Sequence, residues 1–345
     1  MIRDAIKKLV DGEDLAETEA VQVMQEIMDG EATPSQIAAF VTALRIKGET
    51  VEEVSGLARV MREKSVRICT KIAPELLIDT CGTGGGRLNT FNVSTTAAFV
   101  VAGAGIAVAK HGNRAMSGKC GSADVLEALG VEIILSAEQV GKCIDEAGTG
   151  FMFAPTHHPA MKYAVTPRKE IGIRTVFNIL GPLTNPAGAK RQLMGVFEPH
   201  LTELMAGVLR TLGSDRAMVV HGLDGLDELS TVGKTKITEL KDGELITYEI
   251  SPEDFGFKRA VPADLSSGED AEQNARIVEE ILEGKQGPRR DIVLLNAGAA
   301  IMVAGKAESL QEGIALAESV IDSGKALSAL RSLKKLSRTD ASPEK

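Results

Sequence analysis

Residues 79–130 read DTCGTGGGRLNTFNVSTTAAFVVAGAGIAVAKHGNRAMSGKCGSADVLEALG. The apolar run 76–78 directly precedes this stretch and predicts a buried strand, because the glycine cluster 82–86 follows it as the exit from a sheet. A second apolar run, 106–109, predicts a strand that delivers residues 110–114 to the same carboxyl edge. The sequence therefore predicts two loops that meet at one edge of a sheet.

Three polar residues between these predicted strands can cap a helix. Asn92, Ser94 and Thr95 precede or begin the apolar segment 96–101, which we interpret as that helix. The first turn of a helix presents unpaired N–H groups and the positive end of the macrodipole. We therefore expect an anion to bind at this helix start.

The charge pattern also indicates an anionic ligand. The chain carries a formal net charge of -9, yet Lys110, Arg114 and Lys119 follow one another with no acid between them. Such a group of cations beside a glycine loop is typical of a phosphate or carboxylate site. Common nucleotide motifs do not fit, because Arg87 replaces a required glycine of the dinucleotide fingerprint and Cys120 replaces the Ser or Thr of a Walker loop.

The composition indicates a folded protein and excludes some functions. With 43% hydrophobic residues, the 345-residue chain can bury a large core. Acidic residues outnumber basic ones by 48 to 39 and there is no Trp, which is untypical of a nucleic-acid-binding protein. The charged N-terminus and the lack of a run of about 18 apolar residues lead us to expect a cytoplasmic protein without membrane partners.

The order of predicted elements indicates the fold class. Residues 1–66 read as four short helices, of which the last two begin with capping boxes at Thr33 and Thr50. From about residue 70, β-branched runs alternate with helices, residues 235–250 read as a hairpin, and residues 292–295 read as the last buried strand. We predict a small all-helical N-terminal domain and a large α/β domain with a mainly parallel central sheet.

Arg168 is a candidate for a second anion site. Residues 166–178 read as a helix that Thr166 caps, with Pro167 next. Arg168 and Lys169 would then lie in the first turn, where a cation opposes the macrodipole, so a nearby anion would explain them. A solvated surface arginine is the competing interpretation.

An acidic pair follows another predicted strand, residues 217–221. Asp227 and Glu228 lie in a glycine-containing loop, and adjacent carboxylates of this kind suit Mg²⁺, which prefers oxygen ligands. From the residues alone, both would more often be ordinary loop acids.

Several long motifs in this order resemble the anthranilate phosphoribosyltransferase family of tryptophan biosynthesis. They cover nearly the full chain and are GTGG at 82–85, NTFNVST at 89–95, KHGNRAMSGKCGSADVLEALG at 110–130, Arg168, NILGPLTNP at 178–186, HGLDGLDE at 221–228 and LNAG at 295–298. The resemblance implies that the amine of anthranilate attacks C1 of 5-phosphoribosyl 1-pyrophosphate and displaces pyrophosphate. It also implies two Mg²⁺ ions per site and a homodimer through the helical domain.

The resemblance further implies a discontinuous helical domain. It would comprise residues 1–69 and about 166–190, and the α/β domain would comprise residues 70–165 and 191–345. No catalytic side chain is expected, because an aryl amine does not demand a strong general base, and electrostatics and positioning can stabilise the departing pyrophosphate.

The resemblance also assigns binding residues. The sugar diphosphate would contact Gly82, Gly85, Gly86, Thr90, Asn92, Val93, Ser94, Thr95, Lys110, His111, Gly112, Asn113, Arg114, Ala115, Met116, Ser117, Gly118 and Ser122. Anthranilate would contact Gly82, His111, Asn113, His158, Arg168 and Pro182, and Mg²⁺ would be held by Ser94, Asp227 and Glu228. In the competing interpretation the glycines are purely conformational, the histidines are hydrogen-bonded loop residues and Ser122 only caps a helix.

One residue departs from the family pattern, and two other functions compete with the one that the resemblance implies. Gly86 occupies a position where the family usually has Asp, so a carboxylate near the pyrophosphate is missing. A pyrimidine nucleoside phosphorylase shares the fold and the ribose-phosphate chemistry, but KHGNR at 110–114 together with the acidic pair favours the transferase. A non-catalytic nucleic-acid-binding relative is disfavoured by the net negative charge.

Overall fold

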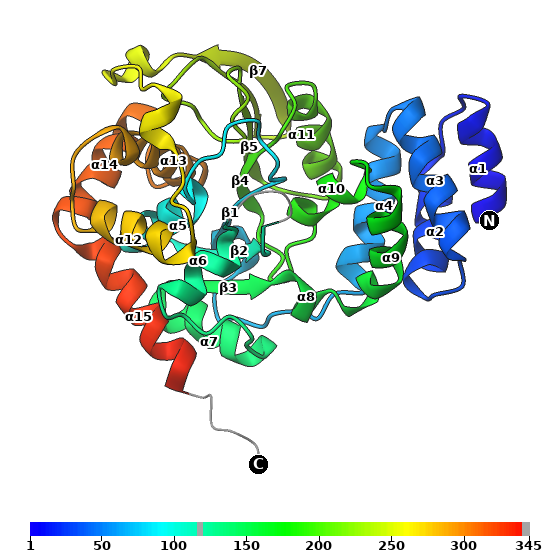
Figure 1. The fold of residues 1–345 in the computed structure, drawn as a ribbon, viewed down its shortest axis with the longest axis horizontal. Coiled ribbons are helices and arrows are strands. Elements are labelled where there is room, and N and C mark those ends of the chain that lie inside the picture. Colours follow the sequence, from blue (N-terminus) through cyan, green and yellow to red (C-terminus); the bar gives the residue numbers. More distant parts are fainter. Residues whose placement is uncertain (116–119, 340–345) are drawn as a thin grey trace.

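The computed structural model describes residues 1–115 and 120–339, and it begins with a helical bundle (Figure 1). Within residues 1–66 the helices are α1 (Ile2–Val10), α2 (Glu17–Met28), α3 (Pro34–Lys47) and α4 (Val51–Glu63). The side chains of Thr33 and Thr50 accept hydrogen bonds from the N–H groups of Gln36 and Glu53 and complete both predicted capping boxes. The predicted helical start is thus confirmed.

A mixed sheet forms the centre of the larger part. Within the described residues its strands are β1 (Leu77–Gly82), β2 (Ala107–Gly112), β3 (Thr149–Phe153), β4 (Arg191–Gly195), β5 (Arg216–Gly222), β6 (Thr235–Lys241) and β7 (Glu244–Ile250). The spatial order is β3-β2-β1-β4-β5-β6-β7, with parallel pairing from β3 to β5 and antiparallel pairing from β5 to β7. The mainly parallel sheet and the hairpin are therefore confirmed.

Helices cover both faces of this sheet (Figure 1). The described helices after the bundle are α5 (Val93–Gly103), α6 (Ser122–Ala128), α7 (Ala137–Ala147), α8 (Ala154–His157), α9 (Lys162–Ile171), α10 (Phe177–Leu180), α11 (Leu201–Thr211), α12 (Ala271–Leu282), α13 (Pro288–Val303), α14 (Leu310–Asp322) and α15 (Lys325–Thr339), of which α9 and α10 pack on the bundle instead of the sheet. One apolar cluster lies between the sheet and α5 with α12 to α15. A second joins the opposite face, through α11, to the N-terminal bundle.

Two predictions about buried segments are wrong. Residues 292–295 lie inside α13 and not in a strand, and every side chain from Ile292 to Ile301 is buried. A helix that is buried on all sides has no amphipathic period, so its apolar run looks like a central strand. Leu76 is 57% exposed because Pro74–Leu76 forms a 3₁₀ turn, and the strand begins one residue later. Among the described residues no helix is long and apolar enough to cross a membrane.

Helix α9 begins at Lys162, four residues before the predicted start at Thr166. Pro167 therefore lies inside the helix, and packing of α9 against α2 and α3 outweighs the backbone hydrogen bond that this proline removes. Helix α10 contacts α4 in the same way. These contacts support the proposed discontinuous helical domain, although its boundary at 166 falls within α9.

Candidate active site

Several loops meet at the carboxyl edge of the parallel strands. We call residues 83–87 the glycine loop and residues 223–228 the acidic loop; the N–H of Arg87 donates to the carbonyl of Gly225 at 2.8 Å and joins them. The start of α5 is joined to the segment after β2, because the Thr95 hydroxyl donates to Ser122 Oγ at 3.1 Å. This confirms the predicted meeting of the loops.

Lys110 lies at the centre of this edge, with its side chain 3% exposed. Its ammonium donates to the carbonyl of Thr80 and to Ser94 Oγ, the latter at 3.4 Å. Burial lowers the pKa of Lys110, and the negative charges of Asp79 and Glu228 oppose that effect. The charge of this buried lysine is therefore favoured by Asp79 on β1 and by Glu228 in the acidic loop.

Asp79 connects this lysine to the neighbouring backbone. Its carboxylate accepts hydrogen bonds from the N–H of His111 at 3.2 Å and from Asn185 Nδ2 at 2.8 Å. Burial raises the pKa of Asp79 to about 6, while Lys110 and these donors favour the charged form. Asn185 also donates to the carbonyl of Ala109 and so fixes the segment after α10 against β2.

The start of α5 lies beside the carboxyl group of Glu228. The helix begins at Val93, three residues earlier than predicted, and Asn92 Nδ2 donates to the carbonyl of Cys120. The backbone of Ser94 is hydrogen bonded to Glu228 and lowers the pKa of that carboxyl. Burial and the charge of Asp227 outweigh this and raise it to about 8. The first turn of α5 thus presents N–H groups to an acidic side chain, and the anion site predicted there stays a prediction.

Asp227 fits against two glycines. A Cβ at Gly195 would lie 1.7 Å from the carbonyl oxygen of Asp227, and a Cβ at Gly86 would lie 2.5 Å from its Oδ1. Neither position can carry a side chain while Asp227 keeps this place. In this structure an Asp at position 86 would therefore require the carboxylate of Asp227 to move.

Asn296 of α13 is hydrogen bonded to the residue that follows the acidic loop. Asn296 is fully buried; its Oδ1 accepts from the N–H of Leu229 at 3.0 Å, and its Nδ2 donates to the Leu229 carbonyl at 2.9 Å. Both backbone groups of the residue after Glu228 are therefore satisfied by one side chain. This positions the acidic pair.

The acidic pair fits a magnesium ion. Asp227 and Glu228 keep some contact with solvent, but burial raises the pKa of both carboxyls, so a dication would relieve their repulsion. Mg²⁺ commonly takes one or two carboxylates and completes its shell with water and substrate phosphates. Accordingly, the described residues contain no group of three or more His, Cys, Asp or Glu side chains that could hold a metal by themselves.

Neutral imidazoles form a second wall of the site. The rings of His111 and His158 lie 5.0 Å apart between centroids, and His111 Nδ1 lies 3.1 Å from the carbonyl of Gly181, next to Pro182. Burial lowers the pKa of His111 to about 3 and that of His158 to about 4. The Nε2 atoms of both have no hydrogen-bond partner among the described residues.

Arg168 lies in the last turn of α9, not in the first as predicted. The predicted conflict with the macrodipole is therefore wrong, since a cation is favoured at this end. Its guanidinium lies 5.3 Å from the ring centroid of Phe177, burial lowers its pKa, and no carboxylate pairs with it in the part of the chain that the structure describes. Phe177 begins α10, which leads to Gly181, whose carbonyl lies 3.1 Å from His111 Nδ1, and to Pro182.

Arg114 corrects the prediction of a cation group without acids. It pairs with Asp124 at 2.8 Å and with Glu127, and its guanidinium lies 5.5 Å from the Phe153 ring. These carboxylates raise its pKa. They follow Arg114 in the sequence, beyond the predicted cation group, and α6 brings them back to it.

The other predicted residues lie around the same elements. Gly82 and Gly112 end β1 and β2, and Val93 is the buried first residue of α5. Thr90 forms a β-bridge with Ser266. Asn113 is exposed, and its carbonyl accepts a hydrogen bond from the N–H of Ala123, while the N–H of Ala115 donates to Asp124. Met116, Ser117, Gly118 and Lys119 lie outside the described residues.

Sequence reasoning missed four residues that position the site. Asn185 lies in the NILGPLTNP motif and Asn296 in the LNAG motif, so membership of these motifs could have indicated their roles. Gly195 ends an ordinary apolar strand, and Arg174 stands alone between α9 and α10; nothing in the local sequence distinguishes either.

The comparisons with known proteins agree with this geometry. The glycosyl transferase family matches twice, with its helical bundle domain over residues 3–65 and its a/b domain over residues 75–327. The anthranilate phosphoribosyltransferase of Acetivibrio thermocellus is 57% identical over 330 residues, which cover 96% of this chain and 95% of the relative.

Solved structures give the same result. The anthranilate phosphoribosyltransferase of Thermus thermophilus superposes with a TM-score of 0.91 at 46% identity, over 97% of this chain and 99% of that one. Two structures of the Saccharomyces cerevisiae enzyme also match, each at 28% identity over 97% of both chains. The structure in complex with PRPP and Mg has a TM-score of 0.88, and the structure in complex with 4-fluoroanthranilate has a TM-score of 0.86.

Asn296→Ala should weaken the whole edge of the sheet. The change leaves both backbone groups of Leu229 unsatisfied in the interior, so we expect the free energy of unfolding in urea to fall by about 2–5 kcal/mol. Asn296→Asp should not rescue the stability at neutral pH, because its buried carboxylate would face the carbonyl oxygens of Leu229 and Ile292. A loss below about 0.5 kcal/mol in the alanine variant would show that Asn296 does not hold the loop.

Proposed function

The chain belongs to the anthranilate phosphoribosyltransferase family, and we propose that it transfers the phosphoribosyl group of 5-phosphoribosyl 1-pyrophosphate to the amine of anthranilate in L-tryptophan biosynthesis. The products are N-(5-phosphoribosyl)anthranilate and pyrophosphate. The observation that carries this proposal is the meeting of Lys110, the start of α5 and the acidic loop at one edge, beside the neutral wall of His111.

The departing diphosphate needs the greatest stabilisation. As the C1–O bond breaks, its electron pair leaves with pyrophosphate, and oriented N–H groups and cations lower the energy of that charge. Residues Val93 to Thr95 present the first turn of α5, and Lys110 lies beside Ser94. The Glu228 carboxyl hydrogen bonded there supports the proposal, because its oxygen is an acceptor on the same backbone group. The glycine residues 82, 85 and 86 would bring the loop backbone close.

Ser94, Asp227 and Glu228 would hold Mg²⁺. When bound, the ion would neutralise negative charge on the leaving diphosphate. The raised pKa of both acidic carboxyls supports this set, as does the S. cerevisiae relative in complex with PRPP and Mg. We propose two ions per site. The remaining phosphate and the ribose would lie along residues 110–118 and Ser122.

Anthranilate would lie between Arg168 and the neutral wall. Its carboxylate would pair with the guanidinium of Arg168, and its ring would contact His111, His158 and Pro182, with Asn113 and Gly82 nearer the ribose. An aryl amine attacks without prior deprotonation, so neutral imidazoles with lowered pKa values are compatible with the reaction. The S. cerevisiae relative with 4-fluoroanthranilate supports this assignment.

We also propose a homodimer through the helical domain, in the cytoplasm. Val10, Ile46 and Val165 are 71%, 81% and 55% exposed on α1, α3 and α9, and α3 contacts both of the other helices. Apolar groups exposed on adjoining helices support an interface there. A sedimentation measurement that gives only the 36.5 kDa monomer would refute it.

The activity can be measured directly from the fluorescence of anthranilate, since the chain has no Trp to interfere. Protein, Mg²⁺, 5-phosphoribosyl 1-pyrophosphate and anthranilate should together show a steady loss of that fluorescence, which chelation of Mg²⁺ should stop. Phosphorolysis of uridine or thymidine should be absent. No loss of anthranilate at saturating substrates would defeat the assignment.

Arg168→Ala should raise the KM for anthranilate by about 10- to 100-fold and change kcat much less, because a charged pairing with the carboxylate serves ground state and transition state alike. Lys169→Ala is the matched control, since Lys169 is exposed on the same turn, and it should behave as the wild type. An unchanged KM in Arg168→Ala would remove this residue from the site.

A further inference from the structure

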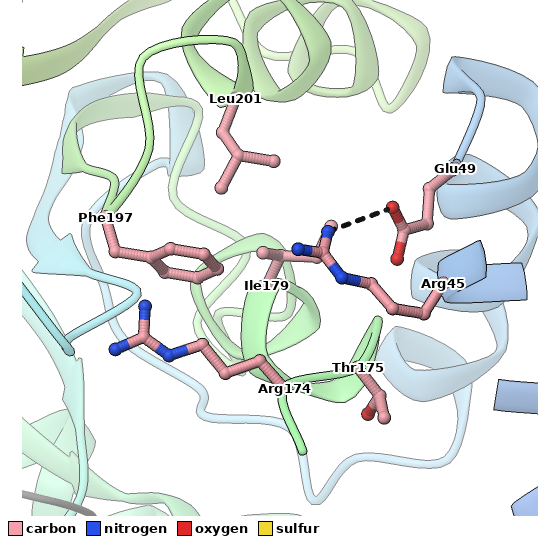
Figure 2. Close-up of a pocket in the computed structure, with 7 residues that line it drawn as sticks. All are labelled: Arg45, Glu49, Arg174, Thr175, Ile179, Phe197 and Leu201. Atoms are coloured by element: carbon pink, nitrogen blue, oxygen red, sulfur yellow. Dashed lines mark ion pairs between the residues drawn. The ribbon is translucent and has the colours of Figure 1, made fainter. Parts of the chain in front are cut away.

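Arg174 links two parts of the site that the sequence keeps far apart. It lies between α9 and α10, and its Nη2 donates to the carbonyl of Gly85 at 2.7 Å. Its guanidinium also lies 4.4 Å from the centroid of the Phe197 ring, and Figure 2 shows the two side chains next to each other across a small cavity from Arg45 and Glu49. Arg174 therefore reaches from the segment that packs on the helical bundle to the glycine loop.

The contact between Arg174 and the loop is close. A Cβ at Gly85 would lie 2.8 Å from Arg174 Nη2, and the φ of Gly85 is 81°, a conformation that favours glycine. The loop is also tied to β4, because the N–H of Thr83 donates to the Gly195 carbonyl and the N–H of Phe197 donates to Thr83 Oγ1. Any ligand that orders this loop therefore acts on atoms that Arg174 touches.

The same segment carries the proposed carboxylate receptor. Arg168 lies six residues before Arg174 and stacks on Phe177, three residues after it. The N–H of Thr175 donates to Asn178 Oδ1 at 2.9 Å and closes the intervening turn. Only a few residues of chain therefore separate Arg174 from both partners of that stack.

We propose that Arg174 is a positioning residue that couples the two halves of the site, so that a diphosphate at the glycine loop and an aromatic acid at Arg168 favour each other's binding. This rests on the proposed function. When a ligand has already ordered the glycine loop, the contact with Arg174 costs less conformational entropy. When Arg174 already holds the loop, binding of the ligand costs less conformational entropy. Because binding linkage is reciprocal, the same factor must appear in both affinities.

The test is calorimetric titration of anthranilate into the full chain with Mg²⁺, with and without saturating inorganic pyrophosphate, a pair that cannot turn over. In the wild type, pyrophosphate should lower the Kd of anthranilate by about fivefold or more. In Arg174→Met, which keeps the aliphatic stem and loses the donor, the ratio should fall to about one, while the Kd of anthranilate alone changes by less than about threefold.

Arg45→Met is the matched control. Arg45 lines the same cavity but pairs with Glu49 and Glu198, each at 3.9 Å, and should leave the ratio at the wild-type value. If Arg174→Met folds poorly, Arg174→Ala with added methylguanidinium replaces it, and the additive should restore the ratio.

A wild-type ratio of one, a full ratio in Arg174→Met, or an equal loss in Arg45→Met would each overturn the inference. These outcomes are separate from the proposed function, which depends on turnover. An active enzyme with a ratio of one removes only the coupling, whereas an inactive protein that still binds both ligands cooperatively removes only the reaction.

Discussion

The buried ammonium of Lys110 is the constraint on which this site depends. Removing a charge from water is costly unless opposite charges and hydrogen bonds compensate for it. Here the compensation comes from Asp79 on β1, from Glu228 on the acidic loop and from acceptors on Thr80 and Ser94. Asp79 in turn holds the backbone of β2 and Asn185. The same network therefore joins neighbouring strands and sets the electrostatic potential of the edge.

Glycines allow the loops to pack closely around these charged residues. The acidic loop approaches β4 and the glycine loop only because Gly195 and Gly86 leave room for Asp227, and Arg174 packs on Gly85 for the same reason. Each contact brings a backbone or a charge closer than any Cβ would permit. The glycine loop, the acidic loop and β4 are consequently in close contact at this edge, and His111, at the end of β2, carries the ring that lies near His158.

Much of the fold could be predicted because its signals are local. The capping boxes at Thr33 and Thr50, the alternation of strands and helices and the hairpin after Thr235 each depend on a few adjacent residues. Residues 292–295 could not be assigned, because burial on every side removes the helical period. The start of α9 was missed since its packing on α2 and α3, which the sequence does not display, overrides Pro167. The fit of Asp227 against Gly86 joins residues distant in sequence and has no local signal.

The central claim is that Lys110, balanced by carboxylates, creates the diphosphate site. Its most direct test is the affinity of Lys110→Met for Mg²⁺ and inorganic pyrophosphate, measured by calorimetry on protein whose circular dichroism matches the wild type. Loss of one charged hydrogen bond should weaken binding by about 10- to 100-fold. Wild-type affinity in this variant would contradict the account, because the diphosphate would then be held without the cation that organises the edge.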